Sequence, residues 1–192
     1  LMKKGPVVLV SFGTIAQPSA FPKDWIHGLV EGLGRLSNFT VIWRFDIDLP
    51  EAAQYPNIHL VPWLPQRDLL KHPNTKLFVT HAGYNSLLES TKEGVPMLLI
   101  PLFVDQFCNA IRAVRLGLGI KVFKNEISSD SIHDAASQVL NDPRFGERAK
   151  AVDAMLSDKL ISAEKALSYR MELLSKHSTK HLPRLYVARN MN

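Results

Sequence analysis

The chain has 192 residues, of which 46% are hydrophobic and 21% are charged, and its formal net charge is +5; these values are ordinary for a soluble globular domain that buries a full core. A single cysteine excludes an internal disulfide and a cysteine-rich zinc site. No apolar run is long enough to cross a bilayer, and the basic residues near the end lack the interleaved aromatic side chains on which single-stranded nucleic acid stacks, so we expect no nucleic-acid partner.

Short apolar runs alternate with helical patterns along the chain. Strands buried on both faces read as apolar, β-branched runs, and apolar residues three or four apart predict helices. Gly94 is expected to end a helix in the left-handed conformation, Ser129 or Asp130 to cap a later helix, and Cys108 to be buried. In chain order, we predict strands at 7–11, 40–45, 60–61, 76–80, 97–100 and 120–123, and helices at 22–36, 67–71, 85–93, 105–115, 129–140, 144–157 and 163–175.

This alternation predicts an α/β fold, a doubly wound parallel sheet of the Rossmann-like kind with helices on both faces. We expect one domain over residues 1–175 and a basic tail over 176–192. Ligands of such folds bind beyond the carboxyl ends of the strands. The candidate site therefore consists of the residues that follow each strand.

The sharpest local pattern is HAGYNS, which starts at His81 directly after a predicted strand. A helix that begins near Asn85 presents free backbone N–H groups, and these attract an anion together with the helix dipole. His81, Asn85 and Ser86 add side-chain donors, and Gly83 leaves room for a bulky anion, which favours a diphosphate site. The alternative is a plain helix cap by Asn85 or Ser86, but it does not explain why a histidine and a glycine meet at the same helix start.

Two other loops carry weaker patterns. After the first strand, Gly13 allows close backbone approach, and the hydroxyls of Ser11 and Thr14 can donate to phosphate oxygens. After the strand at 97–100, Asp105 and Gln106 together suit the hydroxyls of a hexose. The alternatives are a structural turn for the first loop and a helix cap by Asp105 for the second.

Four further residues have side chains suited to a nucleoside. Glu89 lies one helical turn after Asn85 and can accept hydrogen bonds from ribose. Trp63 in a loop between prolines can stack on a base, Gln66 can reach ribose, and Arg44 can meet base or phosphate. The alternatives are a solvent-facing Glu89 and a core position for Trp63.

The segment from Trp63 to Gln106, WLPQRDLLKHPNTKLFVTHAGYNSLLESTKEGVPMLLIPLFVDQ, closely resembles the signature of UDP-glycosyltransferases of the animal type, the UDP-glucuronosyltransferase and glucosyltransferase family. In that signature W-x-P-Q is followed by T-H-x-G-x-N-S, a glutamate, G-x-P and D-Q. The flanking runs VVLVSFGT and VIWRF resemble the strands that precede it, so the resemblance covers nearly the whole chain. By this resemblance the UDP-sugar is bound by Ser11, Gly13, Thr14, Arg44, Trp63, Leu64, Gln66, His81, Gly83, Asn85, Ser86, Glu89, Asp105 and Gln106.

The resemblance implies the carboxyl-terminal, donor-binding domain of a two-domain GT-B enzyme that transfers a hexose or hexuronic acid to a small lipophilic acceptor with inversion. The acceptor pocket and the catalytic base lie in the amino-terminal domain, so no catalytic residue is expected in this chain, and neither is a cofactor or a metal. Full-length relatives are expected at the endoplasmic reticulum membrane, on the luminal side, held by an anchor that this chain lacks. The chain alone is expected to be soluble, to bind UDP and to transfer no sugar.

Three alternatives stay open at this point. A nicotinamide-dependent dehydrogenase is also doubly wound, but SFGTIAQPS lacks the glycine fingerprint that such enzymes carry after the first strand. An epimerase of related architecture also binds UDP-sugars. A non-catalytic nucleotide-binding or interaction domain is the third alternative, and the absence of calorimetric binding to every sugar nucleotide would favour it.

Overall fold

The computed structural model describes residues 1–3, 5–14, 16, 20–158 and 161–176. The chain divides into two compact units, Leu1–Ser157 and Asp158–Asn192. In the first unit, strands and helices alternate as the sequence predicts. The strands are β1 (Val7–Ser11), β2 (Thr40–Arg44), β3 (Ile58–Val61), β4 (Thr75–Thr80), β5 (Met97–Leu99) and β6 (Gly119–Lys121).

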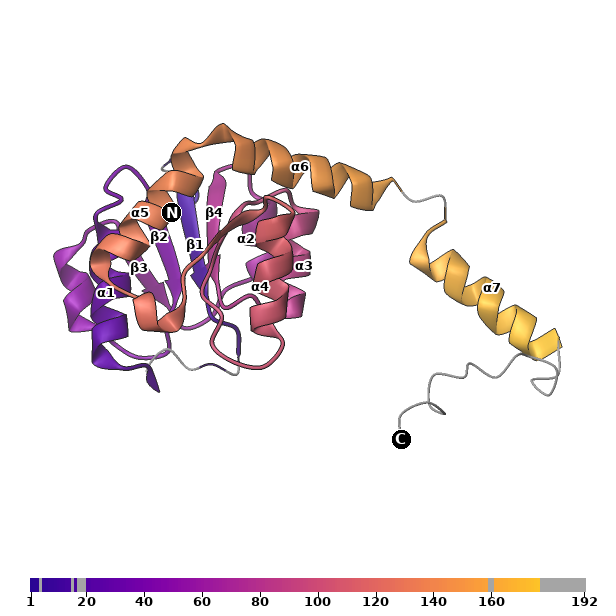
Figure 1. Ribbon diagram of the computed structural model, residues 1–192, viewed down its shortest axis with the longest axis horizontal. Helices are drawn as coiled ribbons and strands as arrows, with labels where there is room; N and C mark the ends of the chain where they lie inside the picture. Colours follow the sequence, from indigo (N-terminus) through magenta and orange to yellow (C-terminus); the bar gives the residue numbers. More distant parts are fainter. Residues whose placement is uncertain (4, 15, 17–19, 159–160, 177–192) are drawn as a thin grey trace. The chain divides into compact units, whose positions relative to one another are not determined.

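These six strands form one sheet in the order β3-β2-β1-β4-β5-β6, and every pairing is parallel (Figure 1). The chain builds from β1 to one edge, then returns to place β4 on the other side of β1 and continues to the opposite edge. The strand order therefore reverses between β1 and β4. In doubly wound sheets this reversal opens a crevice beyond the carboxyl ends of the strands.

Helices cover both faces of the sheet. They are α1 (Lys23–Gly34), α2 (Gln66–Lys71), α3 (Tyr84–Lys92), α4 (Gln106–Arg115), α5 (Ser129–Asn141) and α6 (Pro143–Ser157), with short 3-10 helices η2 (Pro50–Gln54) and η3 (Lys124–Glu126).

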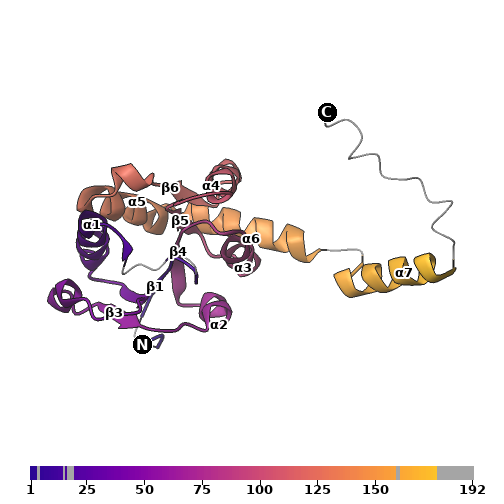
Figure 2. The same cartoon turned by 90° about the horizontal axis from the view of Figure 1, so that it is seen from below.

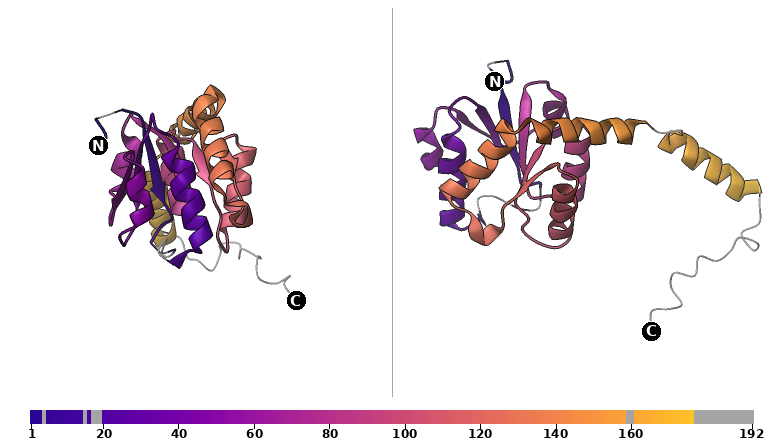
Figure 3. Two further views of the ribbon diagram at one scale, coloured as in Figure 1. Left: turned by 90° about the vertical axis from the view of Figure 1, so that its left-hand side faces the viewer. Right: turned by 45° about the horizontal axis from the view of Figure 1, so that its top comes forward.

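Successive side chains of β1 point to opposite faces. Val8 and Val10 join the core under α1 and α5, whereas Val7 and Leu9 join the core under α2, α4 and α6. Figure 2 shows α1 and α5 on one side of the sheet and α2, α3 and α4 on the other. In Figures 1 and 3, α6 runs from the end of α5 past the amino ends of the strands. The carboxyl ends of the strands are thus left free of this helix.

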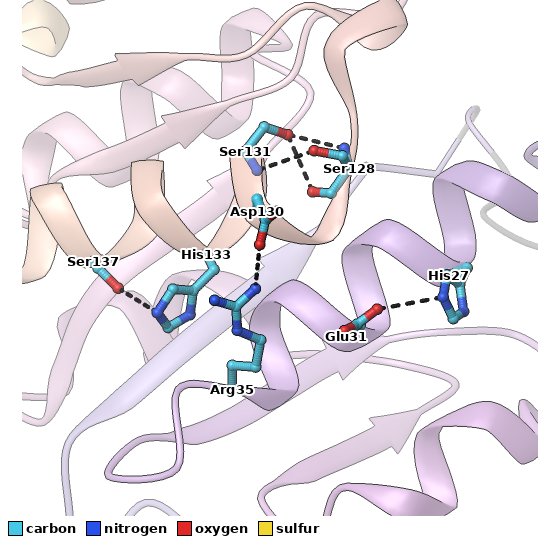
Figure 4. Close-up of polar contacts among 8 residues, drawn as sticks. All are labelled: His27, Glu31, Arg35, Ser128, Asp130, Ser131, His133 and Ser137. Carbon is cyan, nitrogen blue, oxygen red and sulfur yellow. Dashed lines mark hydrogen bonds and ion pairs between the residues drawn. The ribbon is translucent and has the colours of Figure 1, made fainter.

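Helices α1 and α5 approach closely because α1 carries glycines where they meet. A Cβ built at Gly32 would lie 2.7 Å from the Ser129 carbonyl oxygen and 2.8 Å from the Ile132 Cβ. At the end of α1, Arg35 Nη1 donates to Asp130 Oδ1 at 2.7 Å (Figure 4). This ion pair is largely exposed and adds little to stability, so apolar packing holds the two helices together.

The sequence predicts every strand and α-helix of this unit to within a few residues but neither of the two short 3-10 helices, and the left-handed Gly94 (φ 64°) is confirmed. Two details are wrong. The cap of α5 is Ser128, whose Oγ accepts from the Ser131 N–H at 3.1 Å (Figure 4), because Ser128 and the two residues after it are all good caps and the pattern does not fix the choice. Cys108 is exposed, since α4 turns Asn109 and Ala110 toward the sheet instead.

The second unit contains one described helix, α7 (Ala163–Lys176), and none of its residues is buried. Most of the predicted basic tail lies outside the described residues. Of the helices in the described part of the chain, none has both the length and the hydropathy of a membrane span.

Candidate functional site

A cavity of about 540 Å³ lies at the carboxyl ends of the strands, where the strand order reverses. Loops after the first five strands contribute to its wall. Of the residues predicted from the sequence, all but Asp105 line it. The lining residues are Ser11, Gly13, Thr14, Ala16, Arg44, Trp63, Leu64, Pro65, Gln66, Arg67, Asp68, His81, Gly83, Tyr84, Asn85, Ser86, Glu89, Phe103 and Gln106.

The amino end of α3 opens into this cavity without a side-chain cap. Gly83 occupies the cap position with φ −60° and ψ 140°, and among the described residues no side chain accepts a hydrogen bond from this helix end. The first bond of the helix runs from the Leu87 N–H to the Gly83 carbonyl at 2.9 Å. The N–H groups of Tyr84, Asn85 and Ser86 therefore precede the helix ladder. A plain cap by Asn85 or Ser86 is wrong, and the helix end is suited to an anion.

His81 packs between the two glycines of the site. A Cβ at Gly13 would lie 2.8 Å from His81 Cε1, and a Cβ at Gly83 would lie 2.4 Å from His81 Nε2. Burial lowers the pKa of His81, and the nearby negative charge of Asp105 only partly opposes this. The ring is therefore neutral at pH 7. The Thr80 hydroxyl lies 3.4 Å from Nδ1, and the tautomer of the ring determines which of these two atoms donates.

Gln66 joins α2 to α3 through two hydrogen bonds. Its Nε2 donates to Glu89 Oε2 at 2.7 Å and to Ser86 Oγ at 3.2 Å. Glu89 is half-buried at the cavity, so its side chain does not simply face solvent. Its carboxylate has a second oxygen that can accept from a ligand hydroxyl.

Trp63 and Arg44 form another part of the wall. The Trp63 ring is 67% exposed, so the core interpretation of this residue is wrong. The guanidinium carbon of Arg44 lies 5.5 Å from the ring centroid, within the range of a cation–π contact. Arg44 Nη1 also donates to the Gly13 carbonyl, while its buried Nε finds no hydrogen-bond partner among the described residues. Arg44 therefore ties the loop after β1 to the Trp63 loop.

Asp105 and Gln106 lie differently from the prediction. Gln106 is buried and its Oε1 accepts from the N–H groups of Leu102 and Phe103 at 2.9 and 3.1 Å, which leaves its amide nitrogen as the atom that a sugar could meet. Asp105 stands at the cap position of α4 but makes no cap hydrogen bond, so the cap interpretation is wrong. Its Oδ2 accepts instead from Asn109 Nδ2 at 2.7 Å.

Sequence reasoning missed several members of the wall. Arg67 and Asp68 follow the predicted Gln66 within the first turn of α2, and that adjacency was an available signal. Phe103 and Ala16 carry no polar group that could have marked them. Asn109 is also absent from the prediction, although it stands one helical turn after Asp105. Among the described residues, no group of three histidine, cysteine or acidic side chains could hold a metal ion.

Comparison with known protein families gives one match that spans almost the whole chain. The model described as "UDP-glucoronosyl and UDP-glucosyl transferase" matches residues 3–186. Curated relatives include 2-hydroxyacylsphingosine 1-beta-galactosyltransferase of Rattus norvegicus, 34% identical over 91% of this chain and 31% of its own length. UDP-glucuronosyltransferase 1A9 of Homo sapiens is 33% identical over 89% of this chain and 32% of its own. UDP-glucosyltransferase 2 of Dactylopius coccus is 30% identical over 91% and 33%.

Solved structures share the fold. Os79 from O. sativa, determined in complex with UDP, superposes with a TM-score of 0.76 at 23% identity, over 91% of this chain and 42% of that one. The glycotransferase of kitacinnamycin superposes with a TM-score of 0.72 at 25% identity, over 89% and 43%. The chain thus spans about a third of the length of these curated relatives and less than half of the structural ones.

Proposed function

The chain belongs to the UDP-glucuronosyl and UDP-glucosyl transferase family, and from this premise we propose that it is the donor-binding domain of an enzyme that transfers a hexose or hexuronic acid from a UDP-sugar to a small lipophilic acceptor with inversion. The observation that carries the proposal is the uncapped amino end of α3, which opens into the cavity beside His81. A diphosphate placed there meets N–H donors that have no partner within the helix.

The rest of the wall suits the remaining parts of a UDP-sugar. The exposed Trp63 ring offers a surface on which uracil can stack. Glu89, held by Gln66, can accept from ribose hydroxyls. We assign the hydroxyls of the sugar to the amide nitrogen of Gln106, which lines the cavity, and to the carboxylate of its neighbour Asp105 at the start of α4.

In the proposed reaction the acceptor oxygen forms a bond to the anomeric carbon as the bond from that carbon to UDP breaks. Negative charge then grows on the departing diphosphate. The N–H groups at the start of α3 and the His81 side chain stabilise that charge, because they are fixed in place before the reaction. The base that takes the acceptor's proton and the acceptor pocket are assigned to an amino-terminal domain outside this chain.

The relatives named above are a galactosyl-, a glucuronosyl- and a glucosyltransferase, so the likeness does not select one sugar. We assign residues 1–175 to the donor domain and 176–192 to a basic tail that leads toward a membrane anchor. The endoplasmic reticulum membrane, with this domain on the luminal side, is the proposed location of the complete protein.

Isothermal titration calorimetry of the 192-residue chain with UDP, a panel of UDP-sugars and NAD tests the proposal. We expect binding of UDP and of at least one UDP-sugar, and no binding of NAD. His81→Ala combined with Glu89→Ala should weaken UDP binding at least about tenfold, because hydrogen bonds to charged groups contribute about 1.5–3 kcal/mol each.

A matched control is available on α1, where His27 Nε2 lies 3.3 Å from Glu31 Oε2 in an exposed pair that does not line the cavity (Figure 4). His27→Ala combined with Glu31→Ala removes the same two residue types and should leave UDP affinity unchanged. The proposal fails if the chain binds no uridine nucleotide, or if the His81 and Glu89 variant binds UDP as the control does.

A further inference from the structure

Two residues other than glycine adopt the left-handed backbone conformation in the described part of the chain, and both lie in loops at the candidate site. Ala82 has φ 63° in the loop after β4, and Val104 has φ 55° in the loop after β5. Residues other than glycine avoid this backbone region, so a residue adopts it only where surrounding contacts stabilise that conformation.

One buried side chain on α4 contacts both loops. Asn109 is 7% exposed, and its Nδ2 donates to the Ala82 carbonyl at 3.2 Å and to Asp105 Oδ2 at 2.7 Å. An amide NH2 group has two hydrogens, so these two bonds use its full donor capacity. Asn109 itself does not line the cavity.

The bond to Ala82 fixes the direction of a peptide at the start of α3. The carbonyl of Ala82 and the N–H of Gly83 point to opposite sides of the same planar peptide. When Asn109 holds that carbonyl toward α4, the Gly83 N–H is fixed on the other side, immediately ahead of the free N–H groups of the helix. The bond to Asp105 fixes a carboxylate that would otherwise rotate freely at the surface.

We propose that Asn109 is a positioning residue that couples the diphosphate part of the donor site, through Ala82, to the sugar part, through Asp105. This inference rests on the function proposed above and adds a residue that acts through others without touching the ligand. Gln106 supports the same arrangement, since its Oε1 holds the two N–H groups ahead of Val104. The first turns of α4 therefore determine the shape of both loops.

Asn109→Asp is the sharpest test, because it keeps the size of the side chain, removes both donated bonds and places a second carboxylate against Asp105. Asn109→Ala is the second variant, since it removes the same bonds without a new charge. Ser90→Ala is the control: Ser90 is buried on α3 and its Oγ donates to the Val95 carbonyl at 2.9 Å, away from the cavity.

Melting temperatures and calorimetric affinities for UDP and for the UDP-sugar that binds best would be measured on the 192-residue chain of each variant, at a temperature where all are folded. We expect both Asn109 variants to bind UDP about tenfold or more weakly than the unaltered chain does. We also expect each variant to bind the UDP-sugar with the same affinity as UDP, because the sugar part of the site no longer contributes. Ser90→Ala should lower the melting temperature and leave both affinities unchanged.

Unchanged affinities in the Asn109 variants would overturn the inference, because a purely structural asparagine would lower only the melting temperature. Equal affinities of the unaltered chain for UDP and every UDP-sugar would overturn it too, since the sugar part would then contribute nothing to be coupled. Failure of the unaltered chain to bind any uridine nucleotide is a different result, and it would reject the proposed function itself.

Discussion

His81 fills a space that Gly13 and Gly83 leave open, and its burial there should make ligand affinity depend on pH. Burial holds the pKa of the free side chain below its ordinary value of 6.5, whereas a bound diphosphate favours the charged imidazolium. The pKa therefore rises when the ligand binds, and binding takes up a proton. We expect affinity for UDP-glucose to increase as pH falls through the pKa of the complex and to level off below the pKa of the free chain.

The stability of the free chain should change in the opposite direction. Because the unfolded histidine binds a proton more readily than the folded one, the His81 contribution is complete above pH 6.5 and is lost as pH falls through the lower, folded pKa. Calorimetry and urea unfolding between pH 5 and 8 measure both trends. UDP-glucose is the ligand of choice, because the terminal phosphate of UDP titrates near pH 6 itself. In His81→Gln, an affinity that still rises at low pH would contradict this assignment.

A second prediction at this scale concerns Gly83, where a methyl group would lie 2.4 Å from His81 Nε2. Gly83→Ala should therefore displace the ring and weaken UDP binding about tenfold. In a His81→Ala background the space is empty, so Gly83→Ala should cost nothing further. Calorimetry on the two single variants and the double variant measures this dependence, and additive losses would show that Gly83 serves some other purpose.

The sequence could identify most residues of the cavity wall because many of them are polar and lie just after a strand or at the start of the next helix. His81 follows β4 directly and Trp63 lies two residues after β3, whereas Asn85 and Glu89 lie in α3, the helix that follows β4. The role of Asn109 could not be predicted, because it depends on a contact between α4 and the loop after β4. The left-handed backbone of Ala82 could not be predicted either, since alanine normally avoids it.

At the scale of elements, the alternation of strands and helices predicts the parallel sheet. The parallel sheet in turn brings the loops that follow the strands together at the carboxyl ends of the strands. The alternation of strands and helices does not predict how closely α1 and α5 approach each other. Gly28 and Gly32 look like weak points in a predicted helix, because glycine disfavours helix formation. The structure explains them as the surface on which α5 packs.

Gly32→Ala should destabilise the chain for this reason, because the added Cβ would lie within 3 Å of the Ser129 carbonyl oxygen and the Ile132 side chain. Gly146→Ala on α6 is the matched control, since a Cβ there meets no heavy atom within 4 Å, and it should gain about 0.5–1 kcal/mol of helix stability. Relative to that control, we expect Gly32→Ala to lose about 1–3 kcal/mol. Urea unfolding measures both values, and equal free energies of unfolding would disprove the close helix contact.

At the scale of the whole molecule, every residue of the candidate site lies within the unit Leu1–Ser157. The chain corresponds to about a third of the length of these curated relatives, and the part of the reaction proposed for it is donor binding. Sequence composition could not separate the two compact units, because α6 and α7 have the same helical spacing. They differ in burial: Ala149 and Val152 of α6 pack in the core, whereas α7 buries no residue.

A chain that ends at Ser157 should therefore fold and bind UDP with the affinity of the 192-residue chain. It retains the complete sheet, both helical layers and the whole cavity wall, and its 157 residues are enough for an independent core. A chain that ends at Asn141 is the control. It lacks Ala149 and Val152, which belong to the core on the α2, α4 and α6 side of the sheet, so it should unfold at a markedly lower temperature. Thermal unfolding and calorimetry of the three chains measure their melting temperatures and UDP affinities. A loss of UDP binding in the chain ending at Ser157, with its unfolding still cooperative, would show that residues beyond Ser157 contribute to the site.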